Sequence, residues 1–425
     1  MNSIKMLRSK ILGKAKAFSR NHKTFRKVAK KIYYALKGKT FYISSLLTSV
    51  DNKMIYFSTF VGRSYSDTPK AIYEELLQDS RFSDFKFVWV FRDCENYKFL
   101  EQNKNTKVVE LHSKEEKSAL KKSAYWISNY RMFDYYSPKK NQVYVQCWHG
   151  VPLKRLGCDI KNSDNAMNSL EEIWAKYHQD TKRFKYLISP AKWTSEKFAS
   201  AWDLKRFHKE DAIIEEGYPR NDKLINAGKE EIEKIKLLLN LSDIGSKKII
   251  LYAPTWRDNQ YTNGVGYTYE TQVDFERLQR ELSDNYIILF RAHYLVANEF
   301  DFEKYAGFIY DVSKHDDIND LFLVSDLLIT DYSSVFFDFA NLKKPIIYYM
   351  YDMDYYRDGL RGFYLSLDEL PGPIVKEEAD LVSSINSMTK NFVIDEKYIA
   401  FNNKFNYLND GKASKRVIDK IFFPI

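Results

Sequence analysis

Short apolar runs alternate with amphipathic stretches along most of this chain, and this alternation is the feature that most limits how it can fold. The apolar runs predict strands at 54–58, 85–91, 107–111, 124–128, 143–148, 184–189, 248–253, 286–290, 308–312, 327–329 and 345–349. The stretches between them predict helices, among them 69–77, 169–178, 191–199, 229–239, 275–282, 318–324, 379–388 and 413–421. Parallel strands need a crossover connection, usually a helix, so this order predicts an α/β fold with parallel sheets.

The chain is 425 residues long, which is too much for one ordinary domain and favours two. We predict two Rossmann-like domains, at residues 40–215 and 216–425, that face each other across a cleft. The junction is expected near residues 215–245, and the C-terminal helix is free to pack back on the N-terminal domain. Residues 1–39 precede both domains as a separate segment.

Residues 1–39 hold the excess positive charge of the chain. They contain thirteen of its 66 lysines and arginines and no acidic residue, so the remainder, with 53 basic and 57 acidic residues, is slightly acidic. Apolar residues recur in this segment at spacings of three or four, which predicts an amphipathic helix. Basic amphipathic helices are typical of docking on anionic membrane surfaces. A nucleic-acid-binding arm and a solvated helix packed on the body are the alternatives.

Several signatures of other protein classes are missing from the sequence. The cysteines, Cys94, Cys147 and Cys158, are odd in number and lack the spacing of a metal site, which favours a reducing compartment over a disulfide scaffold. There is no HExxH, CxxC, GxGxxG or Walker lysine loop. These absences count against zinc hydrolases, dinucleotide dehydrogenases and kinases. No run reaches the roughly 18–20 apolar residues that would span a bilayer.

Four polar motifs directly follow predicted strands. They are Trp148–Gly150, Pro254–Arg257, Arg291–His293 and Asp331–Ser334. Ligands of parallel α/β sheets bind beyond the carboxyl ends of the strands. Because the four motifs come from both predicted domains, they predict a ligand-binding cleft between these domains.

The stretch Leu327–Asp338 predicts a strand, a tight turn and the beginning of a helix. The first N–H groups of a helix lack partners within it and attract anions. Ser333 and Ser334 lie at this point, so they can cap the helix, bind a phosphate group, or do both. An ordinary helix cap without a ligand is the alternative.

Two histidines are candidate catalytic residues. His149 lies where an apolar strand breaks at a glycine, and a neutral imidazole can take a proton from an alcohol near neutral pH. His293 follows Arg291 by two residues, so on an extended segment both side chains point the same way and can face one anion. A purely structural role is the alternative for each of them.

Five stretches occur together, in a fixed order, between residues 40 and 425. They are Cys147–Lys154, Gly217–Asp222, Tyr252–Arg257, Arg291–His293 and Thr330–Ser334, the last followed by Asp338. This combination resembles the CDP-glycerol glycerophosphotransferase family, whose members prime or extend teichoic acids and related polyol-phosphate polymers. The resemblance implies a GT-B-like fold, in which 40–215 is the acceptor domain and 216–425 the CDP-polyol donor domain, preceded by the basic amphipathic helical segment.

The resemblance also implies a reaction and roles for individual residues. Glycerol phosphate or ribitol phosphate would move from CDP-glycerol or CDP-ribitol to a hydroxyl of a lipid-linked acceptor, releasing CMP without a metal or another cofactor. His149 matches the proposed general base, and His293 matches the histidine that holds or protonates the phosphate. The substrate-binding positions are Trp148, Gly150, Arg220, Pro254, Thr255, Arg291, Ser333, Ser334 and Asp338.

The same resemblance implies a peripheral enzyme at the cytoplasmic face of the cell membrane. Residues 1–39 would bind the anionic membrane surface, and no nucleic-acid partner is expected. The sequence leaves open whether the donor carries glycerol or ribitol, and whether the enzyme is a primase or a polymerase. The alternative functions are a GT-B glycosyltransferase that uses a nucleotide sugar and, less favoured, a non-catalytic membrane-binding protein.

Overall fold

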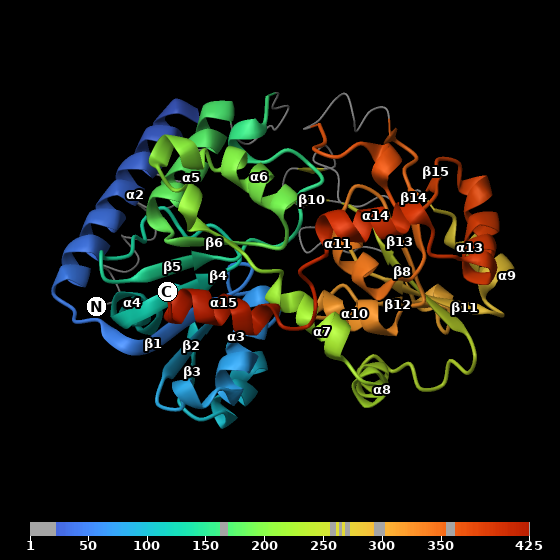
Figure 1. Cartoon of the computed structure of the whole chain (residues 1–425), viewed down its shortest axis with the longest axis horizontal. Helices are drawn as coiled ribbons and strands as arrows, with labels where there is room; N and C mark the ends of the chain where they lie inside the picture. Colours follow the sequence, from blue (N-terminus) through green and yellow to red (C-terminus); the bar gives the residue numbers. More distant parts are fainter. Residues whose placement is uncertain are drawn as a thin grey trace, which may run out of the picture.

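The structure is a computed structural model that describes residues 23–161, 169–255, 261–262, 266–267, 273–292, 302–353 and 362–424. Two sheets of parallel strands lie side by side, each with helices packed around it (Figure 1). Each predicted strand corresponds to a strand of one of these sheets, so the predicted α/β class with parallel sheets is confirmed.

The first sheet has the order β3-β2-β1-β4-β5-β6-β7, and all its neighbouring strands are parallel. Its strands are β1 Asp51–Ser58, β2 Lys86–Phe91, β3 Thr106–Glu110, β4 Ser123–Ser128, β5 Val143–Gln146, β6 Tyr186–Ser189 and β7 Ile213–Glu215. Its helices are α3 Asp67–Gln78, α4 Lys114–Lys122, α5 Leu170–Arg183 and α6 Lys192–Ala201. We call this sheet and its helices the first unit.

The second sheet has the order β12-β11-β8-β13-β14-β15 and is also parallel throughout. Its strands are β8 Lys248–Ala253, β11 Tyr286–Phe290, β12 Ile309–Asp311, β13 Leu327–Thr330, β14 Ile346–Tyr349 and β15 Ile374–Val375. Its helices are α9 Phe275–Leu282, α10 Ile318–Val324, α11 Val335–Phe339, α13 Leu381–Asn391 and α14 Glu396–Phe405. A two-strand hairpin, β9 Tyr261–Thr262 and β10 Gly266–Tyr267, follows β8. We call this sheet and its helices the second unit.

Counted within its own sheet, each unit follows the strand order 3-2-1-4-5-6, and the first unit adds β7 at its edge. In such doubly wound sheets the order reverses between the first and fourth strands, and ligands bind in the crevice that opens there. The crevices therefore lie between β1 and β4 in the first unit and between β8 and β13 in the second. Two of the four polar motifs follow β8 and β13, and the other two follow β5 and β11, the neighbours of β4 and β8.

The chain crosses between the units twice. The turn after β7 leads through α7 Asp222–Asn226 and α8 Lys229–Leu238 to the second unit, and α15 Ala413–Phe422 returns to the first unit (Figure 1). The Phe422 ring lies 4.9 Å from that of Phe82 and 4.3 Å from that of Tyr125. Asp222 accepts hydrogen bonds from the first N–H groups of α15, which fixes where that helix begins.

Helix α2, Lys23–Leu46, lies along the outer edge of the first unit (Figure 1). The boundary expected between residues 39 and 40 falls inside this helix. One face packs on the body, with the Phe41 ring 4.8 Å from Tyr136 and the Lys37 ammonium 3.7 Å from the centre of the Tyr135 ring. Among the helices of the described residues, α2 included, none combines the length and apolar character that a membrane span requires.

Candidate active site

A cavity of about 390 Å³ lies between the two units, at the crevices of both sheets. It is lined by all the predicted site residues that the structure describes: Trp148, His149, Gly150, Arg220, Pro254, Thr255, Arg291, Ser333, Ser334 and Asp338. The predicted residue His293 lies outside the described residues. The polar motifs thus converge on one cleft, although they are separated by up to almost two hundred positions in the sequence.

His149 is held by a sharp turn after β5. Trp148 adopts a left-handed backbone conformation with φ 50°, and its N–H donates to the side-chain oxygen of Gln146 at 2.9 Å. Gly150 has φ 155°, and a Cβ at this position would lie 2.9 Å from the Ser334 hydroxyl. A glycine is therefore required for the first unit to approach the second this closely. The turn leaves His149 exposed to the cleft.

The imidazole of His149 has a defined tautomer. Its Nδ1 lies 2.8 Å from the backbone carbonyl oxygen of Asn129, at the end of β4, so Nδ1 donates and Nε2 is left unprotonated. Although the side chain opens onto the cleft, the protein packed around the ring displaces water that would stabilise the imidazolium, and this desolvation lowers the pKa of His149 below its ordinary value of 6.5. The ring is therefore neutral near pH 7, which is the state a general base requires.

Asp67, which the sequence analysis did not single out, supports this histidine through Asn129. Its carboxylate accepts from the Asn129 amide at 3.0 Å, and the Asn129 side chain in turn accepts from the N–H of Phe60 at 2.8 Å. Asp67 has φ 64° and is the first residue of α3, directly after the loop that leaves β1. Asp67 becomes recognisable only when β1 and β4 are known to be neighbours, because its partner Asn129 follows β4.

Arg220 joins the two units through a pair of carboxylates. Its guanidinium donates to Asp67 of the first unit at 3.1 Å and to Asp338 of the second at 2.6 Å. Burial alone would lower the pKa of Arg220, but the two carboxylates outweigh it and hold the pKa above its ordinary value. Burial also raises the pKa of Asp338, against the opposing effect of Arg220. The Nε–H of Arg220 is buried and has no hydrogen-bond partner among the described residues, and the Arg220 side chain lines the cleft.

The donors on the opposite wall come from the loops after β8 and β13. Asp331 accepts from the backbone N–H of Thr255 at 2.8 Å, which ties these loops together. Helix α11 begins at Val335 and contains only five residues. The Ser334 side chain makes no cap hydrogen bond to this helix, so capping, one of its two predicted roles, is not observed.

Arg291 lies at the cleft but uses part of its guanidinium within the protein. It donates to the carbonyl oxygens of His315 at 2.7 Å and Val312 at 3.3 Å. Burial lowers the pKa of Arg291, and the carboxylates of Asp316 and Asp317 act against that effect. Arg291 therefore holds the loop after β12 in place as well as lining the cavity.

Three further contacts join the two units beside the cleft. The Lys70 ammonium lies 2.7 Å from the carboxylate of Asp317, and both side chains are largely buried. Asp316 accepts from the backbone N–H of Tyr65 at 2.9 Å and from the Tyr97 hydroxyl at 3.2 Å. The two units thus meet through polar contacts beside the cavity, and its shape depends on them.

This arrangement combines a neutral imidazole on one wall with anion-binding groups on the other. An imidazole that faces an alcohol can accept its proton, while arginines and backbone N–H groups at a helix end can stabilise negative charge on phosphate oxygens. The geometry suits transfer of a phosphoryl group between a ligand on the second unit and a hydroxyl at the first.

Comparison with known proteins agrees with this geometry. Residues 40–423 match the family model of CDP-glycerol:poly(glycerophosphate) glycerophosphotransferases. The chain is 39% identical over 420 residues to a teichoic acid poly(glycerol phosphate) polymerase of Staphylococcus epidermidis, covering 96% of this chain and 56% of that protein. It is 39% identical over 383 residues to a teichoic acid glycerol-phosphate transferase of Staphylococcus aureus, covering 89% of this chain and 95% of that protein.

A solved structure supports the same relationship. It is that of a variant of the wall teichoic acid polymerase TagF soaked with CDPG, and it is 36% identical to this chain with a TM-score of 0.80. The match covers 93% of this chain and 96% of that one, so the GT-B-like arrangement of the two units is confirmed. The chain spans just over half the length of the S. epidermidis polymerase, whereas it spans nearly all of the S. aureus transferase.

Proposed function

The chain belongs to the CDP-glycerol:poly(glycerophosphate) glycerophosphotransferase family, and we propose that it transfers glycerol phosphate from CDP-glycerol to a hydroxyl of a membrane-linked teichoic acid acceptor. The observation that carries this proposal is the position of His149. Its Nδ1 is bound to the Asn129 carbonyl and its ring lines the cleft opposite Ser333 and Ser334. A base and an anion-binding wall therefore share one cavity.

In the proposed reaction the acceptor hydroxyl attacks the β-phosphorus of the donor. A new P–O bond forms, the bond from the β-phosphorus to the oxygen of the α-phosphate breaks, and CMP leaves with that oxygen. The acceptor proton passes to Nε2 of His149. The negative charge on the transferred group is stabilised by Arg220 Nε, Arg291 and the N–H groups at the beginning of α11, and no metal takes part.

The donor lies on the second unit in this proposal. Pro254, Thr255 and Asp338 form the nucleotide or polyol pocket, and His293 remains the proposed phosphate ligand. Glycerol is favoured over ribitol because the two curated relatives described above are both named for glycerol phosphate, and the variant of TagF was soaked with CDPG.

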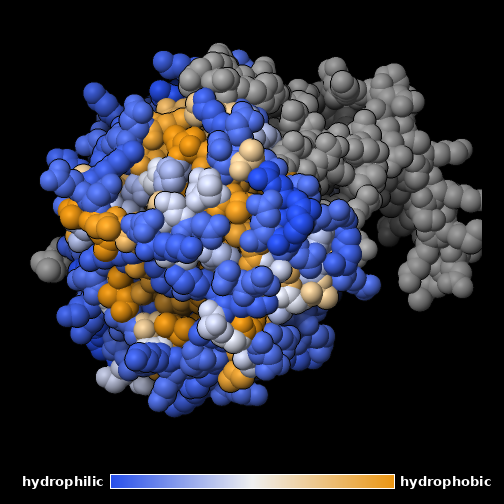
Figure 2. All heavy atoms as spheres, turned by 90° about the vertical axis from the view of Figure 1, so that its right-hand side faces the viewer, coloured by the Kyte–Doolittle hydropathy of each residue, from blue (hydrophilic) through white to orange (hydrophobic). Residues whose placement is uncertain are grey.

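The proposed place of action is the cytoplasmic face of the cell membrane, to which the protein binds peripherally. Helix α2 supports this location, because the face turned away from the body is apolar. Its exposed residues Ile32, Leu36, Ile43 and Leu46, with Leu47 just beyond the helix, recur at helical spacing. Apolar residues of this kind suit the lipid interface, and the basic residues in the sequence of 1–39 suit an anionic one. Figure 2 views another side of the molecule, where hydrophobic patches are interrupted by hydrophilic residues.

A donor panel tests the proposed function. The full chain is incubated with membranes that carry acceptor and with CDP-glycerol, CDP-ribitol or UDP-hexoses, and the released nucleotide is identified. We expect CMP from CDP-glycerol, and less or none from CDP-ribitol. Release of UDP alone would support the nucleotide-sugar glycosyltransferase instead, and release of neither nucleotide would support the non-catalytic membrane-binding protein.

A further inference from the structure

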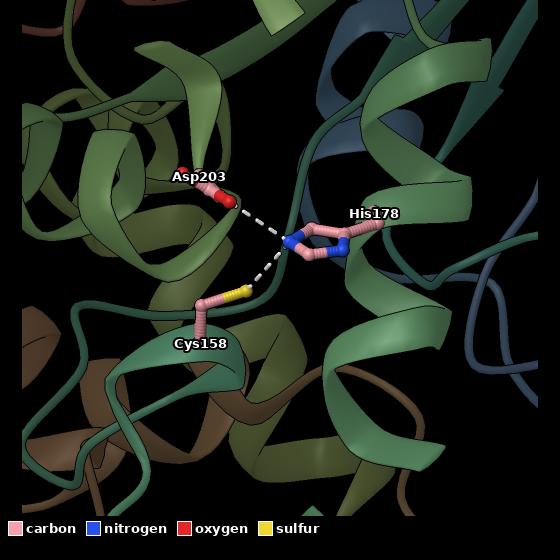
Figure 3. A group of neighbouring side chains, drawn as sticks. All are labelled: Cys158, His178 and Asp203. Carbon is pink, nitrogen blue, oxygen red and sulfur yellow. Dashed lines mark hydrogen bonds and ion pairs between the residues drawn. The ribbon is translucent and has the colours of Figure 1, made fainter. Parts of the chain in front are cut away.

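Away from the cleft, three side chains from separate parts of the first unit converge on one point. Cys158 lies in the short 3-10 helix Gly157–Asp159, His178 in α5, and Asp203 in the turn after α6. The Cys158 sulfur lies 3.3 Å and an Asp203 carboxylate oxygen 2.9 Å from the same nitrogen, Nε2 of His178 (Figure 3). All three potential ligand atoms lie within 4.8 Å of one another.

Hydrogen bonding alone does not satisfy this cluster. If Nε2 carries a proton it donates to Asp203, and Cys158 is left beside it as a weak acceptor. If Nε2 is unprotonated it accepts from the thiol, and its lone pair then faces the carboxylate. The three residues also do not form the catalytic triad of a cysteine nucleophile. In such a triad the thiol and the carboxylate contact opposite ring nitrogens, whereas here both contact Nε2.

A bound cation satisfies all three groups at once. With bonds of about 2.3 Å to sulfur and about 2.0–2.2 Å to nitrogen and oxygen, tetrahedral zinc ligands lie about 3.4–3.6 Å apart. The two separations from Nε2, 3.3 Å to sulfur and 2.9 Å to oxygen, are within about 0.5 Å of these values, and the sulfur and the carboxylate lie within 4.8 Å of each other. Thiolate and imidazole select borderline or soft transition metals over Mg²⁺ or Ca²⁺.

The backbone conformation around Cys158 places its thiol beside His178. Gly157 has φ 47°, and a Cβ there would lie 2.3 Å from the carbonyl oxygen of Ala201 and 2.4 Å from the Tyr177 ring. Only a glycine therefore lets this segment lie against both α5 and α6. On the other side of Cys158, the Asp159 carboxylate accepts from the hydroxyls of Ser200, at 2.6 Å, and Tyr364.

We propose that Cys158, His178 and Asp203 bind one Zn²⁺ ion or a chemically similar divalent metal, with water as the fourth ligand. None of these residues lines the cleft, so the metal site is separate from the proposed reaction. The metal would fasten the segment that runs from the His149 turn to Asp159, of which residues 150–154 and Leu156 line the cleft, to α5 and to the end of α6. Arg206 lies 3.9 Å from the same Asp203 oxygen, but its side chain is largely exposed and can move into solvent.

Cobalt titration of the full chain, reduced and freed of metal by chelation, tests the proposal. We expect one equivalent of Co²⁺ to produce a thiolate-to-cobalt charge-transfer band and the visible bands of a tetrahedral site, and Zn²⁺ to displace it. Cys158→Ser should abolish the charge-transfer band, whereas the matched control Cys94→Ser should keep it. Asp203→Asn should weaken Co²⁺ binding at least tenfold. A wild-type chain without the band, or a band that survives in Cys158→Ser, would overturn the proposal.

A second measurement uses the unsubstituted chain and does not depend on how the variants fold. Iodoacetamide alkylation of Cys158 and Cys94 is followed by mass spectrometry with and without one equivalent of Zn²⁺. Zinc should slow the alkylation of Cys158 at least tenfold and leave that of Cys94 unchanged. Equal rates for Cys158 in both conditions would show that the cluster binds no metal.

Discussion

The proposed role of His149 as general base depends on the groups that surround the imidazole. The left-handed Trp148 and the glycine at 150 turn the chain, the Asn129 carbonyl selects the tautomer, and Asp67 holds Asn129. The sequence pointed to His149, because a histidine that follows an apolar strand and precedes glycine is recognisable locally. Asn129 and Asp67 are recognisable only once β1, β4 and β5 are known to be neighbours.

Replacement of His149 by alanine should remove the base while leaving the fold intact. We expect kcat/KM for CMP release to fall by about 10²–10⁴-fold, the usual contribution of general acid–base catalysis. The matched control is His112→Ala, in which a half-exposed histidine away from the cleft is lost. A His149→Ala enzyme within twofold of wild type would show that another group takes the proton.

The pH dependence of kcat/KM should report the lowered pKa of His149. Burial disfavours the imidazolium, so the neutral and active form persists to lower pH than for an ordinary histidine with pKa 6.5. On the acidic side kcat/KM should therefore fall with a midpoint below pH 6.5, and by tenfold per pH unit well below the folded pKa. An acidic midpoint at or above pH 6.5 would contradict this assignment.

At the level of secondary-structure elements, the residues at which helices begin were partly predictable from the sequence. Ser113 caps α4, accepting from the N–H of Glu116 at 2.9 Å, and the spacing of the two residues predicts a capping box. Glu116 does not complete that box, because its carboxylate accepts from the N–H of His112, one residue before the cap, and from the Tyr56 hydroxyl at 3.2 Å. A complete box occurs instead at Ser169 and Glu172, in the helix predicted at 169–178. Spacing alone does not show which of two possible partners a buried carboxylate takes.

The sequence also does not show which face of helix α2 is buried. The helical spacing of its apolar residues was recognisable, but both faces carry apolar residues, and only the structure distinguishes Phe41, which is buried, from Ile43, which is exposed. Packing on the body and docking on a membrane, which were alternatives for this segment, are therefore compatible. One face of α2 packs on the body, and the other remains available for a membrane surface.

Replacing Ile32, Leu36 and Ile43 together by serine should weaken binding to anionic vesicles at least tenfold, because each side chain contributes apolar area to the interface. Sedimentation with vesicles measures the bound fraction. The matched control replaces Leu237 and Leu238, which are exposed near the end of α8, and should leave binding unchanged. Equal binding of the triple variant and wild type would exclude this face as the docking surface.

At the scale of the molecule, the alternation of strands and helices was sufficient to predict two parallel units, but not the contacts between them. Lys70 pairs with Asp317, and Arg220 with Asp67 and Asp338, across long stretches of sequence. Arg220 was expected at the donor phosphates. It lies at the cleft, and in addition it holds the units together through two buried carboxylates.

Arg220→Ala should therefore destabilise the whole molecule. It leaves the buried carboxylates of Asp67 and Asp338 without their shared cation, which costs about 3–5 kcal/mol in comparable cases. Thermal unfolding should show a clear fall in Tm. Arg81→Ala is the control, since this arginine lies at the surface and its ion pairs with Asp79 and Asp419 are screened by solvent, so a much smaller change in Tm is expected. Similar Tm values for the two variants would show that Arg220 does not couple the units.

Transfer of labelled glycerol phosphate provides the most direct measurement. CDP-glycerol labelled in its glycerol is incubated with acceptor-bearing membranes, and label in the membrane fraction is compared with CMP released. We expect equal amounts of both from the wild-type chain and a loss of at least a hundredfold of both from His149→Ala. CMP released without labelled acceptor would mean hydrolysis rather than transfer, and undiminished transfer by His149→Ala would contradict the assignment of the base.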